Sequence, residues 1–255
     1  MSDRHEGRQA LADKIRDEHL HGSGRSKFVF KVLVALIAVV AAAAVLWLQF
    51  ATSGTADSDV AAPQNSTEQF GFLHTSDAAA GRNPVTVTIY EDFLCPSCKV
   101  FHDETADYLA EQVTAGTIDV EYRPIAFLVN ASPDEYTQRA SNAAACVADL
   151  GGVGAFIAMH DLLLANQPEE GATGLTDDQL TEFAEQAGVA DAVSCIADRT
   201  FESWAAQALD AAIDADVTST PTIRVNDVTI LRSADGKETM PGLEEVQYAI
   251  EQLAE

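Results

Sequence analysis

The sequence predicts an α/β domain with a helical insertion, preceded by one N-terminal transmembrane helix. Three observations lead to this prediction. An uncharged apolar stretch lies near the N-terminus, a β-branched strand pattern runs directly into a Cys-x-x-Cys motif and a helix, and a long alanine-rich segment separates this unit from a second group of strand patterns. With 47% hydrophobic residues in 255, the chain has ample material for a buried core.

The charge of the chain is unevenly distributed. The formal net charge is -25, and residues 1–31 carry seven Lys or Arg against five Asp or Glu, so the remainder sums to -27. A domain with this excess of negative charge is not expected to bind the phosphates of nucleic acid. Acidic surfaces commonly serve solubility, and we therefore infer no partner from the charge.

The apolar stretch from Val32 to Leu48 contains no charged residue. Extended to residues 28–50, it would span about 34 Å as a helix, which is enough to cross a bilayer. A cleaved signal peptide is the alternative, but its apolar core is normally shorter and its charged leader is not this long. We therefore predict a cytoplasmic tail over residues 1–27, an uncleaved anchor over 28–50 and a flexible linker over 51–69.

The charges beside this stretch predict its orientation. Arg25, Lys27 and Lys31 precede it, whereas the following segment up to Gly81 has neither Lys nor Arg. Because positively charged flanks stay in the cytoplasm, we predict a single-pass protein of the cell membrane whose domain, residues 70–255, lies outside. All four cysteines belong to that domain, in a compartment where disulfides persist.

A strand pattern leads directly into the Cys-x-x-Cys motif. Over residues 85–90, Val and Ile alternate with Thr and Tyr after an Asn-Pro turn. Apolar residues then recur at helical spacing from Val100 until Gly116 interrupts the pattern, and a second alternating stretch covers residues 118–123. Strand, helix and strand in this order predict a parallel βαβ unit.

The second half of the domain changes character twice. Residues 133–216 are alanine-rich and helical in pattern, interrupted by glycine and proline, which predicts a helical insertion. Strand patterns return at residues 222–225 and 228–231, joined by Asn226-Asp227 as a two-residue hairpin turn. A final helix is predicted over residues 243–253.

The Cys95-Pro96-Ser97-Cys98 motif stands where the predicted strand ends and the helix begins. Pro96 suits the first helical position, so Cys95 lies at the helix N-terminus, where orphan amides and the helix dipole stabilise a thiolate. Cys98, one turn deeper on the same face, is placed to attack a mixed disulfide formed by Cys95. We predict that Cys95 attacks and that Cys98 resolves.

A Cys-x-x-Cys motif can also form half of a zinc site, or arise by chance. Zinc needs two further ligands, but no second such motif exists, and Cys146 and Cys195 are each isolated in helical sequence. His74 and His102 are the remaining candidates near the motif. We predict no metal site.

A second signal lies near the C-terminus, where Thr220-Pro221 directly precedes a strand pattern. On its own, Pro221 reads as an ordinary proline at a strand start. Together with the dithiol it looks like the cis-proline loop of the thioredoxin superfamily. The segments PVTVTIYEDFLCPSCKVFHDE and STPTIRVND, with the helical insertion between them, resemble the DsbA family of thiol:disulfide oxidoreductases in its membrane-anchored actinobacterial form.

The resemblance implies a thioredoxin fold with an inserted helical domain and a redox-active disulfide in place of any cofactor. It also implies substrate binding at Thr220 and Pro221, and an oxidase that transfers its disulfide to unfolded exported proteins. A membrane partner of the DsbB or VKOR type would re-oxidise it. A reductase or isomerase of the same fold is the alternative, and a binding module with a static disulfide is a third.

One position departs from the family's pattern. Many of these oxidases have His before the second Cys, where Ser97 stands here. A hydroxyl brings no positive charge, so we expect a less acidic first thiol and a milder oxidant. Glu91 and Asp92, just upstream, either accept a proton from Cys98 or end the strand in solvent, and we favour solvent exposure.

The other two cysteines, Cys146 and Cys195, remain once Cys95 is paired with Cys98. Two leftover thiols outside the cytoplasm would be a liability, so we predict a structural disulfide that joins two helices of the insertion. For His102 we expect a packing or surface position, and for His160 no role.

Overall fold

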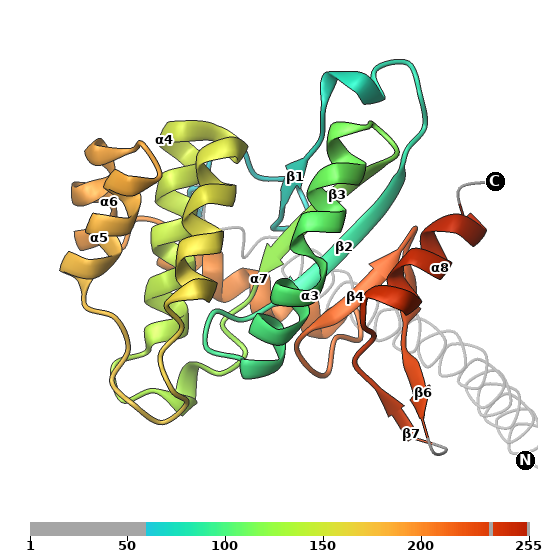
Figure 1. Ribbon diagram of the computed structural model, residues 1–255. Helices are drawn as coiled ribbons and strands as arrows, with labels where there is room; N and C mark the ends of the chain where they lie inside the picture. Colours follow the sequence, from blue (N-terminus) through green and yellow to red (C-terminus); the bar gives the residue numbers. More distant parts are fainter. Residues whose placement is uncertain (1–59, 235–236, 254–255) are drawn as a thin grey trace, which may run out of the picture. The chain divides into compact units, whose positions relative to one another are not determined.

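The computed structural model describes residues 60–234 and 237–253 (Figure 1). The predicted tail and anchor, and the predicted linker up to residue 59, lie outside these described residues. They stay predictions from the sequence.

A five-stranded sheet with the order β1-β3-β2-β4-β5 forms the centre of the domain. The strands are β1 Phe72–His74, β2 Val85–Glu91, β3 Ile118–Pro124, β4 Thr222–Val225 and β5 Val228–Ile230. β2 and β3 are parallel, and β4 lies antiparallel to β2 on its other side. β2 is thus a central strand, and its nearly continuous burial follows from having strands on both edges and helices on both faces.

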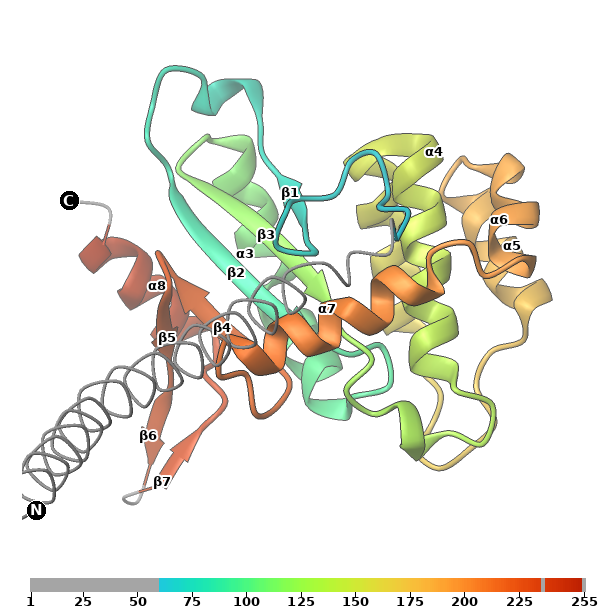
Figure 2. The same cartoon turned by 180° about the vertical axis from the view of Figure 1, so that it is seen from behind.

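Helices cover both faces of this sheet. α3 Pro96–Thr114 links β2 to β3 and packs beside α8 Leu243–Leu253, whereas α7 Glu202–Asp214 also contacts β3. Figure 1 shows α3 and α8 in front of the sheet, and Figure 2, from behind, shows α7 in front of it. The two views place α7 on the face opposite α3.

The insertion lies between β3 and β4 in sequence and forms a helical layer beside the sheet (Figure 1). Besides α7, it contains α4 Tyr136–Ala165, α5 Asp177–Gln186 and α6 Val193–Ala197. Gly152 interrupts α4 with φ 78°, a conformation that favours glycine. Single-turn helices are η1 Asp77–Ala79, η2 Val129–Ala131 and η3 Ala190–Ala192.

Helix α4 is long and apolar enough to cross a membrane, judged by length and composition alone. However, half of its most apolar window is buried inside the domain, where α4 packs against α5, α6 and α7. We therefore describe α4 as the core helix of the insertion.

An aromatic cluster joins the insertion to the sheet. Phe72 of β1 is fully buried, with its ring centroid 4.3 Å from that of Phe156 on α4 and 5.5 Å from that of Trp204 on α7. Aromatic contacts at these separations add to the free energy gained by burial. The sheet and the insertion consequently share one hydrophobic core.

The observed fold confirms the predicted class, an α/β sheet with an inserted helical segment. The Asn226-Asp227 hairpin is also confirmed, since both residues have positive φ, at 46° and 66°. Three short strands were not predicted: β1, and the separate hairpin of β6 Arg232–Ala234 with β7 Lys237–Thr239. Strands of three residues give little alternation, and β5, which is equally short, was predicted together with the Asn226-Asp227 turn that precedes it.

Candidate active site

The two cysteines of the motif lie at the N-terminus of α3. Cys95 is the N-cap residue, with extended backbone dihedrals, and Pro96 opens the helix. Neither thiol is in a disulfide. Cys98 is 1% exposed and Cys95 7%, whereas Pro96 and Ser97 are exposed beside them. A partner protein would therefore reach Cys95 more readily than Cys98.

The pKa values of the two thiols are shifted in opposite directions. A hydrogen bond with Cys98 is the main cause that lowers the pKa of Cys95 to about 6, and the amides of Ser97 and Cys98 add to it against the effect of burial. For Cys98, burial comes first among the causes that raise its pKa well above the usual value. At neutral pH the reduced protein thus holds one thiolate, on Cys95, and one thiol, on Cys98.

The Thr220-Pro221 segment lies against the dithiol although it is far away in sequence. The Cys95 Sγ lies 3.3 Å from the carbonyl oxygen of Thr220, 125 positions away in sequence, and donates a hydrogen bond to it when the thiol is protonated; the Thr220-Pro221 peptide bond is cis. Pro221 is buried, and β4 begins at the next residue. The structure therefore brings the two signals from the sequence together at one site.

The two acids before the motif are buried, so the favoured interpretation of them as solvated strand ends was wrong. Glu91 is 3% exposed and Asp92 is 0% exposed. The reason is that β2 is a central strand, and that His160 of α4 contacts Glu91 and the backbone of Leu128 contacts Asp92, so neither acid reaches the surface. These acids need partners within the protein.

Asp92 finds its partners in backbone amides. Its carboxylate accepts hydrogen bonds from the N–H groups of Leu94 and Leu128, each at 2.7 Å. Burial nevertheless outweighs these bonds and raises the pKa of Asp92 to about 7. The amide N–H of Asp92 faces the Cys98 Sγ at 3.4 Å, where it can stabilise negative charge on that sulfur.

Glu91 pairs with His160 of α4, a residue for which we expected no role from the sequence. His160 Nε2 lies 2.8 Å from Glu91 Oε1, and both side chains are buried. The other ring nitrogen of His160 lies 3.2 Å from Asp161 Oδ1. Burial acts to lower the pKa of His160, but the charge of Glu91 and the hydrogen bonds with both acids outweigh it and raise this pKa to about 9. Glu91 and His160 are 69 residues apart, so no local sequence pattern indicates that they form a pair.

Gln167 is a second residue that the sequence did not indicate. It follows α4, and its Nε2 donates hydrogen bonds to the carbonyl oxygens of Phe93 at 3.1 Å and Cys95 at 3.0 Å. The end of the insertion's longest helix thus fixes the backbone of the loop that carries the first cysteine.

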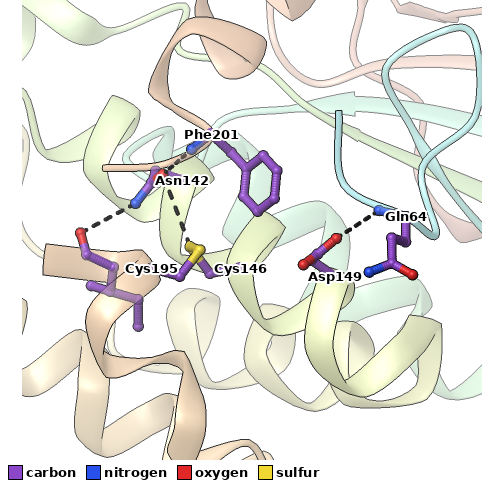
Figure 3. Close-up of a disulfide and its surroundings, with 7 residues drawn as sticks. Gln64, Asn142, Cys146, Asp149, Cys195 and Phe201 are labelled. Atoms are coloured by element: carbon purple, nitrogen blue, oxygen red, sulfur yellow. Dashed lines mark hydrogen bonds between the residues drawn. A yellow bond between two sulfur atoms is a disulfide. The ribbon is translucent and has the colours of Figure 1, made fainter. Parts of the chain in front are cut away.

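The remaining cysteines, Cys146 of α4 and Cys195 of α6, form a disulfide with a Cα–Cα distance of 5.8 Å (Figure 3). Beside it, Asn142 accepts a hydrogen bond from the N–H of Phe201 at 2.8 Å and donates one to the carbonyl of Ile196 at 3.4 Å. Both cysteines belong to the insertion, outside the loop that carries the dithiol.

Comparisons with known proteins agree with this geometry. Residues 79–252 match the family described as thioredoxin. Oxidised DsbA from Mycobacterium tuberculosis is 28% identical, with a TM-score of 0.59, over 72% of this chain and 92% of that one. Reduced DsbG, a disulfide bond oxidoreductase of the same organism, is 31% identical, with a TM-score of 0.57, over 67% and 82%.

A further similarity in sequence is to a part of a much larger protein. A protein named Na(+)/H(+) antiporter NhaA 3, from Salinispora tropica, is 35% identical over 149 residues, which are 56% of this chain but 20% of that protein. The chain spans about a fifth of that relative's length, so the similarity concerns one part of the antiporter.

Proposed function

Since this chain belongs to the thioredoxin family and is a thiol:disulfide oxidoreductase of the DsbA type, we propose that it introduces disulfides into proteins exported from the cell. The observation that supports this direction is the electrostatic contrast between Cys95 and Cys98. A stabilised thiolate makes the reduced form of a dithiol more stable, so the oxidised form gives up its disulfide more readily.

The proposed reaction begins with the Cys95–Cys98 disulfide closed. A substrate thiolate attacks the Cys95 sulfur, a new S–S bond forms, and the bond to Cys98 breaks with its electron pair on Cys98. The amide N–H of Asp92 stabilises the Cys98 sulfur, which then takes up a proton. The second thiolate of the substrate then attacks the substrate sulfur of the mixed disulfide. The substrate disulfide forms and Cys95 leaves as a thiolate, so the substrate loses two electrons and the dithiol gains them.

The surface around Cys95 suits an extended chain. Pro96 and Ser97 are exposed, and Thr220, two residues before β4, lies in contact with the Cys95 sulfur. A substrate segment that runs beside Thr220 would present its cysteine to Cys95, and backbone hydrogen bonds would hold it without selecting a sequence. This fits unfolded proteins as substrates. Ser97 adds no positive charge, which favours a milder oxidant than a protein with His at this place.

The proposal includes the predicted membrane anchor. With residues 28–50 in the cell membrane and the domain outside, the reduced dithiol would pass its two electrons to a membrane partner of the DsbB or VKOR type. The asymmetry of basic residues around the apolar stretch supports this orientation. The catalytic cycle then needs no bound cofactor.

The experiment uses the full-length chain in detergent, oxidised at Cys95 and Cys98 and mixed with a reduced, unfolded protein that has two cysteines. We expect one disulfide to form in the substrate per oxidised chain, measured by mass spectrometry after alkylation. Cys95→Ser should abolish the transfer. Cys98→Ser, mixed instead with a substrate whose two cysteines are already joined, should trap a mixed disulfide: the Cys95 thiolate attacks the substrate disulfide, one substrate thiolate leaves, and no second active-site thiol releases the product. If the wild-type chain does not oxidise the reduced substrate but its reduced form readily reduces a substrate that carries a disulfide, the protein is instead a reductase.

A further inference from the structure

Two histidines and an aspartate meet where α3 packs against α4. His102 lies on α3, one turn after Cys98, and His160 and Asp161 lie on α4. One donor atom from each of the three side chains lies within 4.8 Å of the others. Asp161 Oδ1 is 3.2 Å from His160 Nδ1 and 3.7 Å from His102 Nε2. The centroids of the two imidazole rings are 5.1 Å apart. Disulfide exchange does not use this cluster.

Glu91 contacts the cluster through the other ring nitrogen of His160. Its carboxylate holds the Nε2 of His160 at 2.8 Å, which leaves Nδ1 of the same ring directed at Asp161. Histidines that bind metals commonly donate their second ring N–H to a carboxylate, which fixes the orientation of the ring and strengthens it as a ligand. Glu91 and His160 have this arrangement already.

The surroundings suit a cation that enters from solvent. The exposed fraction of the side chains increases from 1% for His160 through 17% for His102 to 55% for Asp161, so one side of the cluster is open. Within the described part of the chain, Glu91 and Asp161 form ion pairs with these histidines and with no Lys or Arg. The two carboxylates can therefore balance a divalent ion.

From this geometry we propose that His102, His160 and Asp161 bind one Zn²⁺ ion, with water in the fourth position and Glu91 orienting His160. Two imidazoles and one carboxylate are a ligand set that suits zinc, whereas Mg²⁺ and Ca²⁺ prefer oxygen ligands alone. Ligand atoms of tetrahedral zinc lie about 3.3 Å apart. Small rotations of the partly exposed His102 and Asp161 side chains would close the present separations to that value.

Binding would replace the proton on His160 Nδ1 and leave Nε2–H on Glu91. The ion would tie the helix of the dithiol to the insertion. The expectation of no metal site was argued from the Cys-x-x-Cys motif, whereas the ligands proposed here come from two helices and show no motif spacing. The proposal is independent of the direction of disulfide transfer.

The test titrates ZnCl₂ into the full-length chain in detergent, with Cys95 and Cys98 oxidised to a disulfide. Because Cys146 and Cys195 are also bonded, no thiol can bind the metal. We expect calorimetry to show one saturable site that His102→Ala and Asp161→Asn each weaken at least about 100-fold. Glu91→Gln should weaken it by about 10- to 100-fold. Co²⁺ in place of Zn²⁺ should give a visible spectrum without a thiolate charge-transfer band.

Two matched controls show whether the loss is specific. Asp103→Asn removes the neighbouring acid of α3, and His74→Gln removes a histidine of β1, so both should keep the wild-type affinity. Circular dichroism of the metal-free variants checks folding. If His102→Ala is unfolded, the zinc affinity of Asp161→Asn tests the proposal alone, because the Asp161 side chain is more exposed than that of His102. The proposal is overturned if no saturable site exists, if His102→Ala and Asp161→Asn bind as the wild type does, or if His74→Gln loses as much affinity as they do.

Discussion

The side-chain amide of Gln167 donates a hydrogen bond to the backbone carbonyl of Cys95 at 3.0 Å. A second bond from the same nitrogen reaches the carbonyl of Phe93 at 3.1 Å. Gln167 follows α4, so a residue of the helical insertion determines the position of the backbone on both sides of Leu94 and at the first cysteine. The insertion is therefore part of the support of the active site.

Replacing Gln167 with Ala should loosen this loop. We expect the free energy of unfolding to fall by about 1–2 kcal/mol, because two partly buried carbonyl groups lose their donor. We also expect slower disulfide transfer from Cys95. Asn166→Ala is the matched control, since among the described residues the Asn166 side-chain amide bonds only to the carbonyl of Leu162 in the preceding helix. Equal effects of the two substitutions on the transfer rate would contradict a specific role for Gln167.

Reactivity of the reduced protein with iodoacetamide should report the low pKa of Cys95. Only the thiolate reacts, so the alkylation rate of Cys95 should rise with pH around a midpoint near 6. Cys98 should stay unreactive throughout this range, because burial raises its pKa. Peptide mass spectrometry after timed alkylation distinguishes the two. A midpoint near 9 for Cys95 would contradict the stabilisation of its thiolate.

Asp92 should make the reduced protein less stable as pH rises. Its pKa is raised from 3.8 to about 7 in the folded state, so the folded protein binds the proton more tightly than the unfolded chain does. The associated stability is present below pH 4 and is lost as pH rises through 7. It amounts to about 4 kcal/mol.

Asp92→Asn removes this titration. Denaturant unfolding of wild type and variant at several pH values measures the difference between their free energies of unfolding. The wild type should lose stability relative to Asp92→Asn between pH 4 and 8. A difference that does not change with pH would show that Asp92 has an ordinary pKa.

The Cys146–Cys195 disulfide should stabilise the fold without taking part in exchange. It closes a loop with a sequence separation of 49, so replacing both cysteines with Ala should lower the free energy of unfolding by about 4 kcal/mol. Transfer from Cys95 to a reduced substrate should continue at temperatures where the variant is folded. Loss of transfer from the folded variant would mean that this disulfide belongs to the redox pathway.

The parts of the site that could be predicted from sequence are those with local signals. The Cys-x-x-Cys motif, the strand before it and Pro96 at the helix start are consecutive, and Asn226-Asp227 carries its own turn preference. The Thr220-Pro221 segment was identified because the family resemblance supplied its long-range partner. The observed contact of Thr220 with Cys95 is a tertiary one.

The contacts made by the insertion could not be predicted in this way. His160 and Gln167 reach Glu91 and Cys95 only after α4 folds against the end of β2, and no periodicity encodes that packing. The same packing buries Glu91 and Asp92, which is why their expected exposure was wrong. Short strands such as β1 lack the length needed for an alternation.

The reduction potential of the Cys95–Cys98 pair tests the proposed direction of electron flow most directly. The full-length chain is equilibrated with glutathione buffers of known potential, and the reduced fraction of the pair is measured by alkylation. We predict a value near or above about -180 mV, at which the disulfide would pass to substrate thiols. A value near about -270 mV would contradict an oxidase and identify the protein as a reductant.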